Sequence, residues 1–169
     1  SMAGTKIEVD KLGIDFLLSS TQKAWGLPAG FSICSVSDRL IKLSNRIKHK
    51  GYFLDIMVYE KYFLKSQTPT TPSIPHMFAL KTMIDKIFEE GLDERWNRHI
   101  QMAKFTRDWA NSNGQKLFTN INALSNTLTC IENVQNWDIN KINECLLDRG
   151  FRMDRGYGKY RGKAFRISH

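Results

Sequence analysis

The chain has 169 residues, with 25 Lys and Arg against 17 Asp and Glu, and a formal net charge of +8. Its hydrophobic content of 41% excludes a disordered chain, because disordered chains lack the apolar surface that offsets the entropy of ordering. No apolar run approaches the roughly 18 residues of a membrane span, and the first residues lack the pattern of a secretory signal. We therefore expect about one globular domain with no membrane contact. The positive charge permits nucleic acid, an acidic surface or an anionic ligand as partner.

The three cysteines, Cys34, Cys130 and Cys145, are odd in number and widely spaced. This excludes a disulfide framework and a Cys-x-x-Cys metal site, and it fits the reducing cytoplasm. The four histidines show no metal-ligand spacing such as His-x-x-x-His, so we expect no metal site.

Hydrophobic periodicity predicts an α/β chain. Strands are predicted at 14–18, 31–34, 127–133 and 164–167. Helices are predicted after Ser37, over 52–65, between Ser73 and Gly91, over 93–112 and between Asp138 and Gly150. The second part of the chain then forms a small sheet covered by helices on one side.

The two ends of the chain carry strands without predicted neighbours. Nothing precedes the first strand that could pair with it, and the last strand runs almost to His169 without a turn or tail. Because a strand needs partners for its backbone donors and acceptors, we expect this chain to be a piece of a longer polypeptide.

Lys23 lies in a small and polar segment between the first two predicted strands, before a loop with Gly26, Pro28 and Gly30. Ligand sites of α/β proteins gather at strand ends, and a lysine there can act as a Schiff-base nucleophile. On position alone, a solvated loop lysine is the simpler interpretation.

Three segments in order resemble the class V family of pyridoxal-phosphate (PLP) aminotransferases. The first is Ser-Thr-Gln-Lys-x(4)-Pro-Ala-Gly around Lys23, which is similar to the cofactor-lysine loop of that family. The second is Gln-Thr-Pro-Thr-Thr-Pro at 67–72 with the apolar helix after it, and the third is the glycine-rich and Ala-Phe-Arg-Ile stretch at 156–167. The resemblance implies the C-terminal part of a fold type I PLP enzyme. Residues 1–36 would end the large cofactor domain, and 37–169 would form the small domain.

The resemblance also implies roles for individual residues. Lys23 would be the Schiff-base lysine and proton shuttle, and Gln22 would donate to the cofactor phosphate. Thr71, with Thr68 as the weaker candidate, would bind the phosphate held by a neighbouring subunit, which implies a homodimer with shared active sites. Arg166 would bind the substrate, because a guanidinium in an apolar strand needs a partner and an α-carboxylate is a good bidentate one. The substrates would be a small amino acid (alanine, serine or phosphoserine) and a 2-oxo acid (glyoxylate, pyruvate or 2-oxoglutarate).

Other interpretations remain open at this point. A class V desulfurase or lyase is disfavoured, because Gln22 precedes Lys23 where those enzymes usually have histidine, and no cysteine lies in a Gly/Ser-rich loop. A cofactor-free fragment could act as a basic binding module for nucleic acid or acidic proteins, or as a dimerisation surface. In the family that this sequence resembles, the residues that bind the cofactor ring precede the lysine loop, so this chain alone is expected to be inactive.

Overall fold

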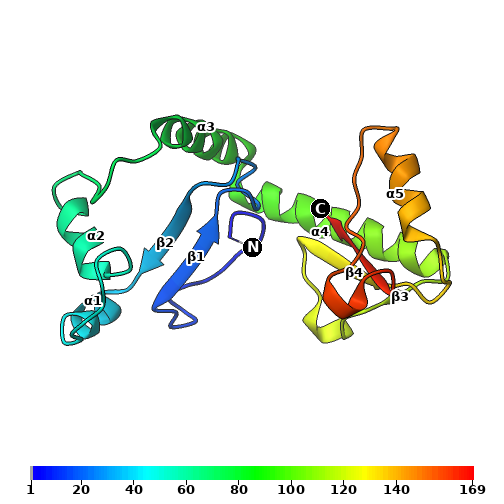
Figure 1. Ribbon diagram of the computed structural model, residues 1–169, viewed down its shortest axis with the longest axis horizontal. Helices are drawn as coiled ribbons and strands as arrows, with labels where there is room; N and C mark the ends of the chain where they lie inside the picture. The colour runs from blue at the N-terminus through cyan, green and yellow to red at the C-terminus, as the bar shows by residue number, and fades with distance from the viewer. Residues whose placement is uncertain (1) are drawn as a thin grey trace. The chain divides into compact units, whose positions relative to one another are not determined.

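The computed structural model describes residues 2–169, which divide into two compact units (Figure 1); the boundary in the chain lies between Glu90 and Gly91. Unit 1 extends to Glu90, and unit 2 runs from Gly91 to His169. The domain division expected above, 1–36 and 37–169, refers to the complete enzyme and stays a prediction.

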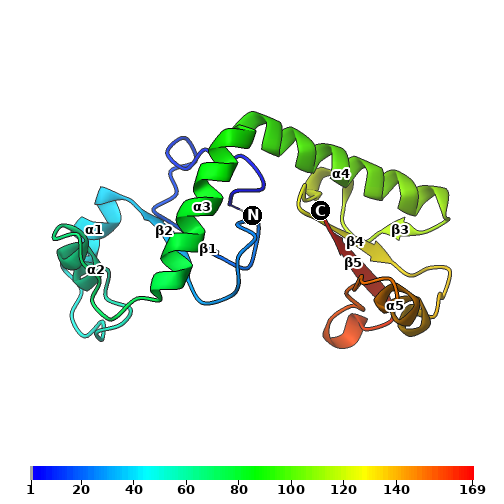
Figure 2. The same cartoon turned by 90° about the horizontal axis from the view of Figure 1, so that it is seen from above.

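Unit 1 is a two-stranded antiparallel ribbon with three helices. Strand β1 (Phe16–Ser20) pairs with β2 (Ser32–Val36) in a register that sets Phe16 opposite Val36. The helices that follow are α1 (Asp38–Ser44), α2 (Ile56–Phe63) and α3 (Ile74–Glu90). Helix α3 is drawn above the ribbon in Figure 1 and crosses in front of it in Figure 2.

Capping side chains explain where the first two helices begin. Ser37 accepts a hydrogen bond from the Leu40 amide and donates one from its own hydroxyl to Asp15, 2.6 Å away. Asp55 accepts from the Met57 amide and forms an ion pair of 2.9 Å with Lys50. Such caps satisfy amide groups that the first helical turn leaves without partners.

Unit 2 is a three-stranded antiparallel sheet with two helices. The helices are α4 (Leu92–Ser112) and α5 (Ile139–Leu147). The strands β3 (Lys116–Leu117), β4 (Leu128–Glu132) and β5 (Ala164–Ser168) lie in the order β3-β4-β5. Two short 3-10 turns, Ile121–Ala123 and Gly158–Tyr160, complete the unit.

One hydrophobic cluster forms the core of unit 2. Ile131 of β4 and Phe165 of β5 lie directly opposite each other and pack with Ala110 of α4 and Ile139 of α5. Because alternate residues of a strand point to opposite faces, both helices contribute to the face that carries Ile131 and Phe165. The expected α/β character and the small sheet with helices on one side are confirmed. Arg166 belongs to the opposite face.

The elements that differ most from the sequence-based expectation are the first strand, helix α2 and strand β3. The first strand is Phe16–Ser20 rather than 14–18, since Ser19 and Ser20 are part of the ladder. Helix α2 is shorter than 52–65, because Asp55 caps it at its start. Strand β3 was not expected, since two residues carry no periodicity.

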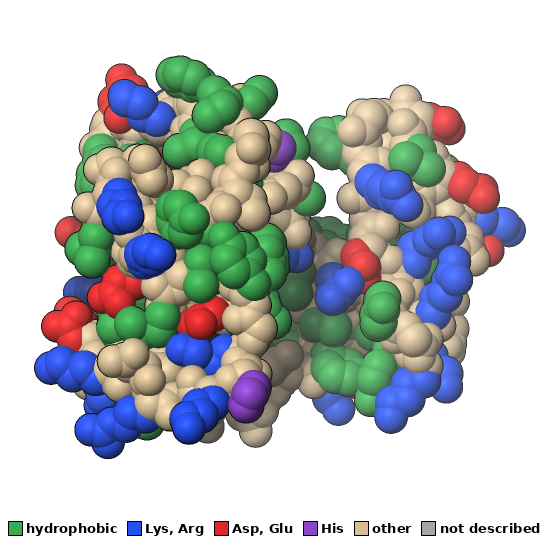
Figure 3. All heavy atoms as spheres, turned by 60° about the vertical axis from the view of Figure 1, so that its left-hand side comes forward, with side chains coloured by type: hydrophobic (Ala, Val, Ile, Leu, Met, Phe, Trp, Pro, Cys, Tyr) green, Lys and Arg blue, Asp and Glu red, His purple; other side chains and the backbone are tan. Residues whose placement is uncertain are grey.

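The surface of the described residues carries mixed charge. Lys and Arg side chains occupy several separate groups on the visible faces of both units, with acidic and hydrophobic side chains between them (Figure 3). Among residues 2–169, no helix is both long enough and apolar enough to span a bilayer.

Candidate active site

The loop between β1 and β2 holds Lys23, and buried Thr21 organises this loop. Thr21 is 0% exposed, and its hydroxyl donates to the Pro28 carbonyl at 2.8 Å. Its amide donates to Phe31, and its carbonyl accepts from Leu27, each at 3.1 Å. These bonds tie the beginning of the loop to its end, so the backbone around Lys23 has a defined path.

Two further contacts fix the lysine turn itself. The Lys23 amide donates to the Ser20 carbonyl at 3.1 Å, and the Gly26 amide donates to the Lys23 carbonyl at 2.9 Å. The indole N–H of Trp25 donates to Ser19 Oγ at 3.1 Å. The polar end of β1 therefore has its partners within the loop.

Lys23 and Gln22 are both exposed. Within residues 2–169, neither side chain has a hydrogen bond or ion pair to another residue. A primary amine on an ordered turn, without a carboxylate partner, is a suitable nucleophile for the aldehyde group of a cofactor. The amide of Gln22 next to it offers two N–H donors to an anion. The residues present on this loop therefore fit pyridoxal phosphate.

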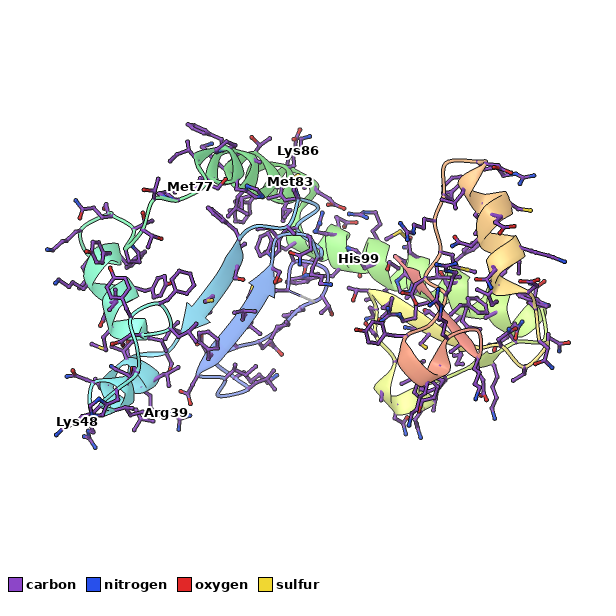
Figure 4. All side chains as sticks on the ribbon, viewed as in Figure 1. Arg39, Lys48, Met77, Met83, Lys86 and His99 are labelled. Atoms are coloured by element: carbon purple, nitrogen blue, oxygen red, sulfur yellow. The ribbon has the colours of Figure 1, made fainter. Side chains whose placement is uncertain are left out.

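Helix α3 packs on the same loop. The rings of Phe31 and His76 lie 5.4 Å apart between centroids, and a Cβ placed on Gly30 would come within 2.8 Å of His76 Nε2. Met83 extends from α3 toward the ribbon, and its Cε lies 3.6 Å from where a Cβ on Gly26 would stand (Figure 4). The Lys23 loop is therefore supported from β1, from β2 and from α3.

The Thr/Pro segment at 67–72 leads directly into α3. The hydroxyl of Thr68 donates a hydrogen bond to the Thr70 carbonyl at 2.8 Å, so this donor is occupied within the segment. Thr71 is exposed, and among the described residues its hydroxyl has no partner. The Tyr52 hydroxyl donates to the Pro69 carbonyl at 3.3 Å. Of the two threonines, Thr71 is the one whose hydroxyl is available to a ligand.

Arg166 belongs to unit 2 and already has a carboxylate partner in this chain. Its Nε donates to Asp154 Oδ1 at 2.9 Å, and its Nη2 donates to Asp154 Oδ2 at 2.7 Å. The Arg166 guanidinium holds the pKa of the Asp154 carboxyl below its usual range, and the Gly156 amide acts in the same direction. Both groups are charged near neutral pH.

The structure groups the candidate residues by unit. Lys23 and Gln22 share a loop of unit 1, and Thr68 and Thr71 share a second segment of that unit, joined to the loop through α3. Arg166 lies in unit 2.

Two residues that matter for this arrangement were not singled out from the sequence. Thr21 stood inside the quoted lysine motif without a role, and its signal was a threonine at a strand end before a Pro/Gly loop. Asp154 belongs to none of the quoted motifs, and no local sequence pattern predicts its pairing with Arg166.

Comparison with known proteins places these residues in a family. The model of the family "Aminotransferase class-V" matches residues 1–158. An uncharacterised aminotransferase of Methanocaldococcus jannaschii is 33% identical over 172 aligned residues, covering 100% of this chain and 45% of that protein. Serine–glyoxylate aminotransferase of Arabidopsis thaliana is 32% identical, covering 100% of this chain and 43% of that protein.

A solved aminotransferase structure is also similar to this chain. Alanine–glyoxylate aminotransferase from Nostoc sp. superposes with a TM-score of 0.89 at 26% identity, over 99% of this chain and 46% of that one. The chain thus spans about half the length of the relatives it matches. Lys23, Gln22, Thr68 and Thr71 lie inside the matched family segment, and Arg166 lies after its end at residue 158.

Proposed function

The chain belongs to the class-V aminotransferase family, whose cofactor is pyridoxal phosphate, and from this premise we propose that it is the C-terminal part of a transaminase. The complete enzyme exchanges an amino group between a small amino acid and a 2-oxo acid. Alanine, serine and phosphoserine are the candidate donors, and glyoxylate, pyruvate and 2-oxoglutarate are the candidate acceptors. The observation that carries the proposal is the amine of Lys23, which has no partner in the described residues and stands on a turn fixed by buried Thr21.

Lys23 has two tasks in this proposal. Its Nζ would hold the cofactor, and the same amine would move a proton away from the substrate α-carbon. Pyridoxal phosphate supplies the electron sink for that proton transfer. The ordered turn contributes by keeping the amine close to the carbon that it deprotonates.

Gln22 and Thr71 are proposed to bind the cofactor phosphate. Gln22 would donate its amide to the phosphate held by its own subunit. Thr71 would donate its hydroxyl to the phosphate of the partner subunit in a homodimer. The free hydroxyl of Thr71 supports this assignment over Thr68, because the Thr68 hydroxyl already donates a hydrogen bond to the Thr70 carbonyl.

Arg166 is proposed to bind the substrate carboxylate. A guanidinium has five N–H donors, and the pair with Asp154 uses two of them. The remaining donors suffice for a second carboxylate.

We also propose a cytoplasmic enzyme, which the three free cysteines support, since two of them, Cys34 and Cys145, are exposed.

The test uses the full-length protein loaded with pyridoxal phosphate. Borohydride reduction followed by peptide mass mapping should place a pyridoxyl adduct on Lys23. Lys23→Ala should lose the adduct and all measurable turnover in a panel of the donors and acceptors named above. Lys86→Ala, which removes an exposed lysine of α3, is the matched control and should keep both (Figure 4).

Two results would count against the proposal. An adduct on another lysine, with Lys23→Ala still active, would reassign the catalytic residue. A protein that takes up no cofactor would favour the cofactor-free alternative, a basic binding or dimerisation module.

A further inference from the structure

Asp154 and Arg166 are joined more rigidly than a surface ion pair usually is. The two carboxylate oxygens of Asp154 meet Nε and Nη2 of Arg166 at 2.9 and 2.7 Å, a two-point contact along one edge of the guanidinium. The two residues also form an isolated antiparallel bridge, in which the Arg166 amide donates to the Asp154 carbonyl at 3.3 Å. The side-chain contact and the backbone bridge therefore both hold Asp154 next to Arg166.

The Asp154 carboxylate is itself held in place. Its Oδ1 accepts from the Gly156 amide at 2.9 Å. Gly156 has φ +83°, and a Cβ there would come within 2.5 Å of the carbonyl oxygens of Ala164 and Tyr160. The backbone after Asp154 thus lies tightly against the start of β5, the strand that carries Arg166.

The pair leaves one edge of Arg166 without a protein partner. In the described part of the chain, neither N–H of Nη1 makes a hydrogen bond, and the second N–H of Nη2 is also left over. These two nitrogens form the other bidentate edge of the guanidinium, which matches a carboxylate. The Arg166 side chain is 38% exposed, so a ligand can reach it.

We propose that Asp154 is a positioning residue, which holds the Nε–Nη2 edge of Arg166 so that the Nη1–Nη2 edge stands ready for the substrate carboxylate. The proposal rests on the function assigned above to Arg166. An unrestrained arginine loses rotamer freedom when it binds a ligand, whereas Arg166 has lost it already in the free protein. Asp154 acts through Arg166 and does not touch the substrate.

The opposite role, a carboxylate that competes with the substrate, fits the contacts less well. A competitor must swing away when the substrate arrives. Asp154 is restrained by the Gly156 amide and by the backbone bridge, and it occupies a different edge of Arg166 from the one left open.

The experiment compares variants of the full-length, cofactor-loaded enzyme. Asp154→Ala should raise KM for the amino acid about tenfold and change kcat less than threefold, because positioning affects binding of the carboxylate and not the proton transfer at Lys23. The inhibition constant of propionate, a carboxylate that cannot react, should rise by the same factor. Asp154→Asn keeps one acceptor oxygen and should fall between Asp154→Ala and the unsubstituted enzyme.

Controls separate this inference from the proposed function. Asp148→Ala removes an exposed carboxylate at the end of α5 and should leave KM and the propionate constant unchanged. Arg166→Lys keeps the charge and loses the two-edged fork, so it should raise both values. If Arg166→Lys changes neither value, the proposed role of Arg166 is wrong.

If Arg166→Lys raises both values while Asp154→Ala and Asp154→Asn leave them unchanged or lower them, the positioning role of Asp154 alone is overturned. Thermal unfolding of each variant shows whether the fold is intact. Asp154→Asn retains the oxygen for the Gly156 amide, so it tests the charge even if Asp154→Ala fails to fold.

Discussion

The imidazole of His76 lies against the ring of Phe31, with 5.4 Å between their centroids. Phe31 ends the loop that presents Lys23, and His76 stands in the first turn of α3. The contact therefore joins the lysine loop to the helix that follows the Thr/Pro segment. Two segments that are proposed to serve two different cofactor sites, one in this subunit and one in its partner, are thus connected by the same pair of rings.

Gly30→Ala should loosen this junction. Its new Cβ would meet His76 Nε2 at 2.8 Å and Cε1 at 3.0 Å, and overpacking of this kind costs about 1–3 kcal/mol. We expect faster amide hydrogen exchange over residues 21–31 and a lower free energy of unfolding. In a His76→Ala background the ring is absent, so the same substitution should cost about 1 kcal/mol less. Equal costs in both backgrounds would show that His76 is not what Gly30 accommodates.

Gly156→Ala should be much more damaging than Gly158→Ala. Both glycines have positive φ, +83° and +54°, so both substitutions carry the left-handed backbone penalty of roughly 1–2 kcal/mol. Only at Gly156 would the Cβ also collide with backbone, the carbonyl oxygens of Ala164 and Tyr160, whereas nothing lies within 4 Å at Gly158. Urea unfolding should show an extra loss of at least about 2 kcal/mol for Gly156→Ala. A similar loss for both variants would contradict the close approach.

Acid should weaken unit 1 through Asp55. The Lys50 ammonium, 2.9 Å away, holds the pKa of the Asp55 carboxyl below its usual value, and the Met57 amide adds to this. The folded state thus binds the proton less readily than the unfolded state, whose aspartates titrate near about pH 3.9. The stabilisation is therefore complete above that pH and is lost as pH falls through the lower pKa of the folded state.

Midpoint temperatures of thermal unfolding, measured between about pH 2 and 7, check this expectation. Asp55→Asn should lower the midpoint at neutral pH, and its difference from the unsubstituted protein should shrink below about pH 4. Asp85→Asn is the matched control, because Asp85 pairs with Lys81 on an exposed helix surface, where ion pairs contribute little. A difference for Asp55→Asn that stays constant down to the lowest pH would rule out the carboxylate as its source.

Local signals in the sequence predicted the parts of the fold that depend on neighbouring residues. Helices were predicted to begin after Ser37 and after Asp138, and both side chains accept the amide hydrogen bonds of a first turn. A cap is decided within four residues, so the sequence contains the whole interaction. The apolar spacing of α3 and α4 similarly predicted long helices.

Contacts between distant residues were not predictable in the same way. The partner of Arg166 is Asp154, which precedes it by twelve residues and reaches it through a loop that turns at Gly156. The need of Arg166 for a carboxylate partner was inferred from its apolar strand, but not that this chain supplies one. Ser19 and Ser20 suggested loop by composition, yet they belong to β1, where Ser19 is held by Trp25. The roles of Lys23 and Thr71 came from the family resemblance, because neither residue type is diagnostic alone.

The buried hydroxyl of Thr21 gives the sharpest test of how the lysine loop is built. Thr21→Val is nearly isosteric and keeps the packing, but it removes the donor to the Pro28 carbonyl and the acceptor for the Phe31 amide. Leaving such groups without partners at a buried site costs about 1–3 kcal/mol. Thr21→Ser makes the complementary change, since it keeps the hydroxyl and loses only a methyl group.

If the hydroxyl fixes the loop, Thr21→Val should accelerate amide hydrogen exchange over residues 21–31. It should also weaken pyridoxal phosphate binding in the full-length protein, because the backbone that carries Lys23 and Gln22 is then no longer held in one conformation. Thr21→Ser should keep both properties close to those of the unsubstituted protein. The reverse ranking, with Thr21→Ser the more damaged variant, would mean that methyl packing rather than the hydrogen bonds holds the turn. Since Thr21 is 0% exposed and two residues from Lys23, either ranking identifies the force that positions the amine.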